Sequence, residues 1–174
     1  MKPIVIVTGN PGAGKSTLAR RLALAAERGL HLDSDLFYGF PARPIDPTTP
    51  DSREQNETIL RALARCARTF SEGAYDVFFD GVVGPWVLPL VRAELRGLEL
   101  HYVVLRANEA DALARVRSRD GEGQDARVSQ MYRAFAEVGE HAARVVATSG
   151  RRRRDVFAEV SDGLRAGRFL LGAE

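Results

Sequence analysis

Five short runs of mainly apolar residues divide the chain. They are PIVIV at 3–7, GLHLD at 29–33, DVFFD at 76–80, ELHYVVL at 99–105 and RVVAT at 144–148. Apolar residues that follow one another in this way, rather than alternate with polar ones, are typical of strands covered on both faces. The stretches between the runs have helical spacing and are long enough to connect parallel strands. The pattern therefore predicts an α/β fold, with a parallel sheet and helices on both of its faces.

Two of the intervening helices have recognisable beginnings. Thr49 and Pro50 suit the cap and the first position of a helix that ends at Gly73. Asn108 suits the cap of another helix, whose first turn carries acidic residues where the helix dipole favours them. A last helix is expected from about residue 155 to residue 166. The apolar face of the first of these helices consists of Ile59, Leu60, Leu63, Ala67 and Phe70.

Two segments lack such patterns. FPARPIDPTTP, residues 40–50, contains four prolines and is predicted to be a structured loop rather than a hinge between domains. RDGEGQD, residues 119–125, combines glycines with acidic residues, and we expect a mobile loop between two helices, a lid over a bound ligand. Since no repeat or low-complexity linker interrupts the chain, we expect a single domain over residues 1–174.

Composition narrows the class of protein. With 174 residues, 45% of them hydrophobic, the chain can form one compact core but is too short for two ordinary domains. The arginines behind the net charge of +2 are spread along the chain, so they argue only weakly for a polyanionic partner. The one cysteine, Cys66, excludes an internal disulfide and is predicted to fill space in a helix rather than to act as a reactive thiol.

Location and association follow from what the sequence lacks. No charged and apolar leader precedes the first apolar run, and no run approaches the length that spans a membrane. We therefore expect a cytoplasmic protein with no membrane partner, present as a monomer or a homodimer.

The stretch TGNPGAGKST, residues 8–17, carries the clearest chemistry. Gly9, Gly14, Lys15 and Ser16 have the spacing G-x-x-x-x-G-K-[ST] between a predicted strand and a predicted helix, the context of a loop that cradles nucleotide phosphates. Chance is a poor explanation for the lysine of this motif, because the chain has only one other lysine, Lys2, against 23 arginines. Backbone N–H groups and Lys15 are predicted to hold the phosphates, and Ser16 to bind Mg²⁺. The predicted nucleotide-binding residues are Gly9, Asn10, Pro11, Gly12, Ala13, Gly14, Lys15, Ser16 and Thr17.

Carboxylates follow two of the predicted strands, where ligands of open parallel sheets bind. Asp80 ends the third run and is a candidate for binding Mg²⁺ with Ser16, or for binding substrate. Asp35 follows the second run and suits a group that orients or deprotonates an attacking hydroxyl, while Asp33, two residues earlier, could face the same way. For each of the three, a helix cap or a loop carboxylate is the structural alternative.

Two arginines are candidates for stabilising a transferring phosphoryl group. Arg115 and Arg119 are four residues apart and share a helix face, whereas Arg117 points elsewhere. Their face leads into the 119–125 loop, so closure of this lid would bring them onto the phosphates. The alternative is a solvated helix face with pairs such as that of Asp111 with Arg115.

Aromatic residues lie near the candidate carboxylates. Phe37, Tyr38, Phe40 and Trp86 are predicted to line an apolar pocket for the acceptor, or else to belong to the core. The block RRRR at 151–154 would suit a nucleic-acid partner, but no aromatic residues are interleaved with it, and a solvated loop near the nucleotide base is favoured.

The three histidines, His31, His101 and His141, show no metal-ligand spacing, so core or surface roles are expected for them.

With GNPGAGKST, LDSDLFYGF, VFFDGVV, an arginine-bearing helix before a lid loop and VVATSG, the chain resembles the P-loop small-molecule kinases. Within them it is most similar to the group around chloramphenicol phosphotransferase and the gluconate-kinase-like proteins. The resemblance implies a three-layer P-loop NTPase fold with a five-stranded parallel sheet, and transfer of the γ-phosphate of Mg²⁺-ATP to a hydroxyl of a small molecule. It also implies that Asp35 is the catalytic base, that Arg115 or Arg119 is a lid arginine, and that residues 145–150 lie near the adenine.

Rival functions fit the same loop less well. A GTPase switch would need D-x-x-G after the third run, but Val83 stands where the glycine is required. A nucleoside monophosphate kinase would need arginines near the third run, where DGVVGPW has none, although Arg43 and Arg53 could substitute. A polynucleotide-end kinase and a non-catalytic ATP-binding regulator remain as further alternatives. No strict motif fixes ATP over GTP, and nothing names the acceptor.

Overall fold

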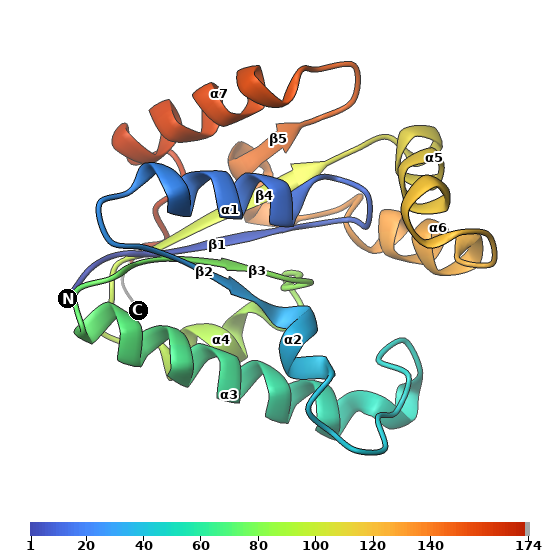
Figure 1. Ribbon diagram of the computed structural model, residues 1–174, viewed down its shortest axis with the longest axis horizontal. Coiled ribbons are helices and arrows are strands. Elements are labelled where there is room, and N and C mark those ends of the chain that lie inside the picture. Colours follow the sequence, from blue (N-terminus) through green and yellow to red (C-terminus); the bar gives the residue numbers. More distant parts are fainter. Residues whose placement is uncertain (173–174) are drawn as a thin grey trace.

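A five-stranded parallel sheet forms the centre of the molecule (Figure 1). The computed structural model of the chain describes residues 1–172. Neighbouring strands are all parallel, in the order β2-β3-β1-β4-β5, which confirms the predicted fold class. The strands are β1 Ile4–Gly9, β2 Gly29–Asp33, β3 Asp76–Asp80, β4 Leu100–Arg106 and β5 Val145–Ala147.

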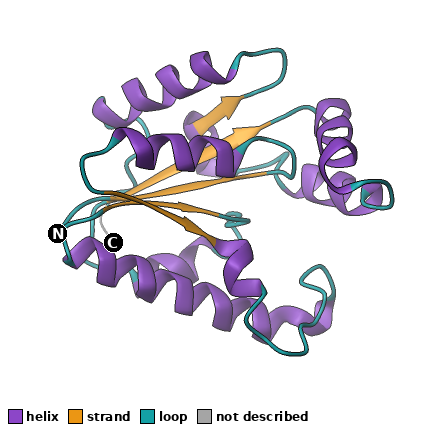
Figure 2. Ribbon diagram, viewed as in Figure 1, coloured by secondary structure: helices purple, strands orange, loops and turns teal. Residues whose placement is uncertain are grey.

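Helices cover both faces of the sheet (Figure 2). Helices α1 and α7 lie on one face, and α3 and α4 lie on the other. Helices α2, α5 and α6 lie beyond the carboxyl ends of the strands (Figure 1). The helices are α1 Lys15–Ala25, α2 Ser34–Tyr38, α3 Arg53–Glu72, α4 Leu88–Glu94, α5 Glu109–Asp120, α6 Asp125–Ala134 and α7 Arg153–Arg165, with 3₁₀ turns at Pro50–Ser52 and Gly139–Arg144.

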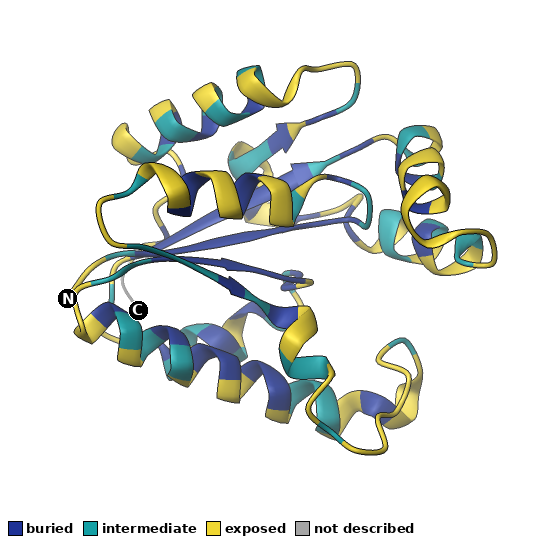
Figure 3. Ribbon diagram, in the orientation of Figure 1, coloured by how far each residue is buried: buried dark blue, intermediate teal, exposed yellow. Residues whose placement is uncertain are grey.

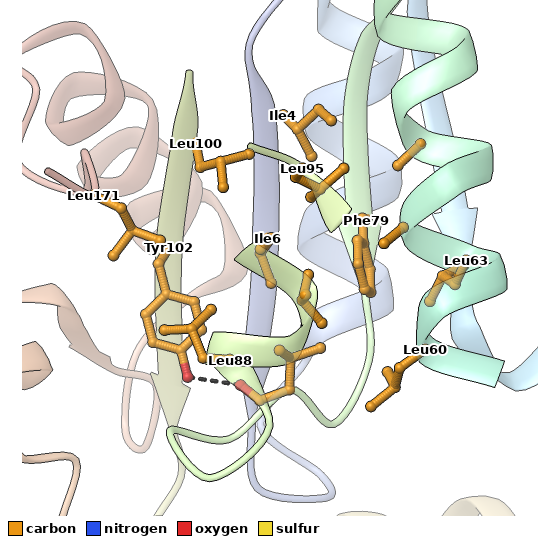
Figure 4. Close-up of a cluster of buried hydrophobic side chains, with 14 of the residues drawn as sticks. Ile4, Ile6, Leu60, Leu63, Phe79, Leu88, Leu95, Leu100, Tyr102 and Leu171 are labelled. Carbon is orange, nitrogen blue, oxygen red and sulfur yellow. Dashed lines mark hydrogen bonds between the residues drawn. The ribbon is translucent and has the colours of Figure 1, made fainter. Parts of the chain in front are cut away.

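Two layers of core explain why the strand sequences are continuously apolar (Figure 3). Successive side chains of a strand point to opposite faces, so Ile4 and Ile6 pack against the α3 side while Val5 and Val7 pack against the α1 side. Figure 4 shows the α3 side, where the fully buried Tyr102 donates its hydroxyl to the carbonyl oxygen of Val83 over 2.6 Å.

Strand boundaries differ from the predictions by one or two residues. The first predicted strand, 3–7, begins at Ile4 and continues to Gly9, because the turn into the phosphate loop comes only after that glycine. The runs at 29–33 and 76–80 match β2 and β3. The runs at 99–105 and 144–148 become Leu100–Arg106 and Val145–Ala147.

Helix boundaries also required corrections. Thr49 is the N-cap and Pro50 the first residue, as predicted, but the helix starts as a 3₁₀ turn and becomes α-helical only at Arg53. The Thr49 hydroxyl donates to the carbonyl oxygen of Asp46 and makes no capping hydrogen bond. The last helix is Arg153–Arg165 instead of 155–166.

The predicted 119–125 loop is confined to residues 121–124. Arg119 and Asp120 still belong to α5, and Asp125 already belongs to α6, whose first turn an acidic residue suits. Asn108 caps α5 as predicted, since its Oδ1 accepts from the N–H of Asp111 over 2.8 Å. Helices α2 and α4 were not predicted.

Candidate active site

The phosphate loop joins β1 to α1 through residues with left-handed backbone. Gly9, Gly12 and Gly14 have φ angles of 138°, 74° and 95°. A Cβ atom on Gly9 would lie 1.9 Å from the carbonyl oxygen of Leu105, and only glycine avoids that overlap. Gly14 is the N-cap of α1, so the loop opens directly onto the positive end of a helix. The sequence pattern predicted this geometry correctly.

Asn10 holds the phosphate loop in place. Its side chain is fully buried, and its Oδ1 accepts from the N–H of Ala107 over 3.1 Å while its Nδ2 lies 3.4 Å from the carbonyl oxygen of the same residue. This double contact ties the loop to the end of β4. Among the predicted nucleotide-binding residues, Asn10 therefore contributes as a support for the loop rather than with a free side chain.

A cavity of about 820 Å³ extends from the phosphate loop. Its walls are residues 12–18 of the loop and α1, the face of α5, the end of β5 and the start of α7. A volume of this size is that of a typical cofactor site. The cavity residues beyond the phosphate loop include Arg21, Ala114, Arg115, Ser118, Arg119, Thr148, Arg151, Arg153 and Phe157.

Lys15 is half-buried at the floor of the cavity. Burial lowers the pKa of its ammonium group, while the carboxylates of Asp80 and Asp35 raise it. Its Nζ lies 3.4 Å from the carbonyl oxygen of Asn10, in the same loop.

Asp80 lies behind the phosphate loop, with only 2% of its surface exposed. Ser16 donates its hydroxyl to Asp80 Oδ2 over 2.5 Å, and His31 Nε2 lies 2.5 Å from Asp80 Oδ1. The hydrogen bond to Asp80 raises the pKa of His31. The three side chains of His31, Asp33 and Asp80 can offer ligand atoms within 4.8 Å of one another. The structure thus brings together Ser16 and Asp80, as predicted, and adds His31.

Asp33 and Asp35, two residues apart, have different surroundings. Asp33 caps α2, because its Oδ1 accepts from the N–H of Asp35 over 2.9 Å. Burial raises the pKa of the Asp33 carboxyl, which that backbone contact opposes. Asp35 is exposed in the first turn of α2, and its carboxylate forms no hydrogen bond or ion pair with any group in residues 1–172. Its charge nevertheless acts on Lys15 and Arg119, so it lies on the phosphate side of α2.

Arg115 and Arg119 both line the cavity but have different partners. Arg115 donates to the carbonyl oxygen of Gly12 over 3.0 Å and lies 3.5 Å from the hydroxyl of Thr148. Arg119 forms two contacts of 2.7 Å with Asp120, and its charge lowers the pKa of Lys15. Arg117 pairs with Asp125 at the lid, away from the cavity, as its helix position predicted.

Arg127, on α6, is a site candidate that sequence reasoning missed. It is exposed and forms no hydrogen bond or ion pair within the described part of the chain, yet its charge acts on Lys15 and Tyr38 from the opposite side of the site. Its approach depends on the way α6 turns back after the 121–124 loop (Figure 1), which no local pattern reveals. Burial raises the pKa of Tyr38, and the carboxylate of Asp35 adds to the effect.

The predicted acceptor-pocket aromatics separate into two groups. Phe37 packs against the core on the α3 side, at 5.1 Å from the ring of Phe40, which is exposed. Trp86 is half exposed and covers Phe135 at a ring distance of 5.2 Å. Its ring also lies against Gly84, where a Cβ atom would come within 2.2 Å of the indole.

Three arginines of the block at the start of α7 pair with carboxylates, and they share two carboxylates between them. Arg151 pairs with Glu159 at 2.5 Å, and Arg152 and Arg154 both pair with Asp155. Arg151 and Arg153 line the cavity, on the side away from the phosphate loop. Only Arg151 and Arg152 lie in a loop, since Arg153 and Arg154 already belong to α7. Proximity of the block to the nucleotide base stays a prediction.

Cys66 is half-buried on α3 and packs against the core, and burial raises the pKa of its thiol. Neither its position nor its pKa indicates a reactive group.

Known proteins resemble this chain in sequence and in fold. A family model described as an AAA domain matches residues 5–137. The shikimate kinase of Mycobacterium tuberculosis is 33% identical over 111 residues, which are 63% of this chain and 60% of that protein. The chain thus spans about 60% of the length of the curated relatives it matches.

Solved structures extend the likeness to nearly the whole chain. A gluconokinase from Sinorhizobium meliloti 1021 has a TM-score of 0.68 at 19% identity, covering 94% of this chain and 92% of that one. The tunicamycin resistance protein of Deinococcus radiodurans has a TM-score of 0.69 at 21% identity, covering 99% of both chains. The resemblance to P-loop small-molecule kinases is confirmed at the level of family and fold. Of the helices within residues 1–172, none combines the length and the apolar character needed to cross a membrane.

Proposed function

We propose that this chain, which belongs to the AAA-domain family matched over residues 5–137, is a kinase that transfers the γ-phosphoryl group of Mg²⁺-ATP to a hydroxyl of a small molecule. One observation carries the proposal. A phosphate loop with Lys15 faces the exposed carboxylate of Asp35, which has no hydrogen-bond partner of its own in residues 1–172. A carboxylate with no structural partner, beside a phosphate site, suits a group that orients or deprotonates an attacking alcohol.

Different residues bind the phosphates and activate the acceptor. Lys15 and the backbone of residues 10–16 hold the β- and γ-phosphates at the start of α1. Asp35 accepts the proton of the acceptor hydroxyl, whose oxygen forms the new bond to the γ-phosphorus while the bond to the β,γ-bridging oxygen breaks and ADP leaves. Arg119 and Arg127 neutralise the charge of the transferring group from the α5 and α6 side.

Oxygen donors next to the phosphate loop fit a magnesium ion. The Ser16 hydroxyl and the carboxylates of Asp33 and Asp80 are hard ligands, which Mg²⁺ prefers over sulfur or nitrogen. Bound with the nucleotide, Mg²⁺ would screen the phosphate charges and orient the γ-phosphate. Ser16 is the residue we expect to touch the ion, with Asp80 behind it.

The acceptor should have an apolar part. Of the eight large apolar side chains that are exposed in residues 1–172, five lie in the segments that follow β2 or β3. Exposed apolar side chains in the segments after parallel strands are candidates for a binding surface, because ligands of open sheets bind beyond the carboxyl ends of the strands. The five are Leu36, Phe40, Ile45, Val82 and Trp86. This favours an alcohol with an apolar or aromatic body over a compact polyhydroxylated one.

The test is a coupled ADP-release assay with Mg²⁺-ATP and a panel of hydroxylated metabolites, nucleoside monophosphates and hydroxyl-bearing antibiotics. The protein should turn over one class of small alcohol. Lys15→Ala should abolish transfer, and Asp35→Asn should lower kcat about 100-fold or more with little change in ATP affinity. Asp51→Asn, which removes another exposed carboxylate, is the matched control. Equal turnover in wild type and Asp35→Asn would remove Asp35 from the mechanism.

Nucleoside monophosphates belong in the panel because a nucleotide acceptor would indicate the related nucleotide kinases. Turnover confined to them would replace the small-alcohol proposal.

A further inference from the structure

His31, Asp80 and Ser16 form one continuous hydrogen-bonded chain from the edge strand β2 to the phosphate loop. His31 Nε2 lies 2.5 Å from Asp80 Oδ1, and Ser16 Oγ lies 2.5 Å from Asp80 Oδ2. Asp80 is almost completely buried, so its carboxylate depends on these partners. Both carboxylate oxygens are therefore engaged, one by each neighbour.

Strand register explains how the chain forms. In the parallel pair of β2 and β3, His31 lies beside Phe78, and Asp33 lies beside Asp80. Residues two apart in a strand point to the same face, so the side chains of His31 and Asp80 share a face of the sheet. Phe78 packs in the core on the α1 side, and Ser16 lies in the first turn of α1.

Hydrogen-bond directions follow from the chemistry of the groups. An ionised carboxylate only accepts, so both His31 and Ser16 must donate to Asp80. A serine hydroxyl has one proton, and here it is committed to Asp80 Oδ2. The lone pairs of Ser16 Oγ are consequently turned away from Asp80 and remain available to a ligand.

The spacing of His31 and Asp80 is that of a hydrogen-bonded pair rather than that of two ligands of one ion. Two ligand atoms at right angles around an ion with bonds of about 2.1 Å are roughly 3 Å apart. The His31 Nε2 and Asp80 Oδ1 atoms are only 2.5 Å apart, closer than two ligands of one ion and in the arrangement of a short hydrogen bond. His31 is therefore a partner of the carboxylate rather than a metal ligand.

We propose that His31 is a positioning residue for the divalent-ion site of the nucleotide. It fixes the Asp80 carboxylate, which orients the Ser16 hydroxyl so that its lone pair faces the ion that accompanies ATP. Removal of a group that hydrogen-bonds to a metal ligand typically lowers the metal affinity about 10–100-fold. The inference rests on the proposed function only in taking Mg²⁺-ATP as the ligand, and it requires no acceptor.

The experiment compares ATP affinity with and without Mg²⁺ by titration calorimetry, in saturating MgCl₂ and in EDTA. The ratio of ATP affinity in MgCl₂ to ATP affinity in EDTA should be about tenfold or more smaller in His31→Leu than in the wild type. The affinity in EDTA should be unchanged. His31→Gln, whose amide can still donate to Asp80, should retain the wild-type value within about threefold. His31→Asn, whose amide is shorter, should behave like His31→Leu and replaces it if the leucine variant does not fold.

His101→Gln is the matched control, since His101 is a buried histidine of β4 that pairs with Glu99, just before this strand, and lies outside the site. It should leave both affinities unchanged. An equal Mg²⁺ effect in wild type, His31→Leu and His31→Asn would overturn the inference and leave the proposed function intact. Absence of any Mg²⁺-dependent ATP binding in the wild type would overturn both.

A second readout separates positioning from direct ligation. Co²⁺ added without nucleotide should give no visible absorption band that depends on His31. A band present in the wild type and lost in His31→Gln would make His31 a ligand and overturn the positioning role.

Discussion

Arg115 connects α5 to the phosphate loop, donating from Nη1 to the carbonyl oxygen of Gly12 over 3.0 Å. The same guanidinium lies 3.4 Å from the carbonyl oxygen of Thr148, after β5, and 3.6 Å from the carboxylate of Asp111. Arg119, on the same helix face, contacts neither Gly12 nor Thr148 and instead pairs with Asp120. Two arginines that the sequence groups together are thus held by different partners.

Arg115→Ala is expected to weaken nucleotide binding more than turnover. The guanidinium holds the phosphate loop against the segment after β5, so its loss should raise the Kd and KM for ATP about tenfold while kcat falls less than about threefold. Steady-state kinetics with varied ATP, together with direct titration of ATP, measure the two effects. A large fall in kcat at unchanged KM would instead place Arg115 at the transferring phosphoryl group.

Arg119→Ala and Arg127→Ala are expected to lower turnover more than nucleotide binding. Both charges act on Lys15 and neither contacts the loop backbone, so each removal should lower kcat about 10–100-fold with little change in ATP affinity. Arg117→Ala is the control, since Arg117 pairs with Asp125 at the lid. Wild-type rates in both variants would exclude these arginines from the mechanism.

Sequence alone predicted the parts of the site that depend on local pattern. The phosphate loop, the cap at Asn108 and the strand ends at Asp33 and Asp80 all rest on residues close together in the chain. Helix ends were less accurate, because competing local hydrogen bonds decide them, as the Thr49 contact with Asp46 shows.

The missed residues depend on long-range contacts. The sequence around His31 does not indicate a role in the site. Its partner Asp80 is 49 positions away and comes close only through the pairing of β2 with β3. Arg127 reaches the site through the turn between α5 and α6. Asn10 matched the loop pattern, but its buried contact with Ala107 could be known only once β1 and β4 were neighbours.

Tyr102→Phe is expected to destabilise the protein. The hydroxyl that it removes is buried and donates to the carbonyl oxygen of Val83 over 2.6 Å (Figure 4), so the variant leaves a buried carbonyl unpaired. The loss should be about 1–3 kcal/mol in the free energy of unfolding, measured by urea denaturation. Because Val83 begins the segment that carries Trp86, the KM for the acceptor should also rise. Unchanged stability would mean that water or a shift of the loop satisfies Val83.

Ala74→Gly is expected to stabilise the protein. Ala74 follows the end of α3 with a φ of 64°, a backbone conformation that glycine adopts without cost. Relief of that strain should add about 0.5–1 kcal/mol, or roughly 2–3 °C in Tm, after allowance for the freer unfolded chain. Gly167→Ala, at a φ of 71° after α7, should lower Tm by a similar amount. If both variants moved Tm in the same direction, backbone strain would not be the cause.

His141→Phe is expected to change how stability depends on pH. His141 is buried against the ring of Tyr102 at 5.0 Å, and burial lowers its pKa, an effect that the carboxylate of Glu140 opposes. In the unfolded chain a histidine titrates near about 6.5, so below that pH the unfolded state takes up a proton that the folded state resists. The wild type should therefore lose stability as pH falls from 7.5 to 5.5, and the phenylalanine variant, which keeps the ring contact, should lose less. Tm measured for both proteins across this range gives the comparison, and a Tm difference that stays constant with pH would show that His141 does not titrate between the two states.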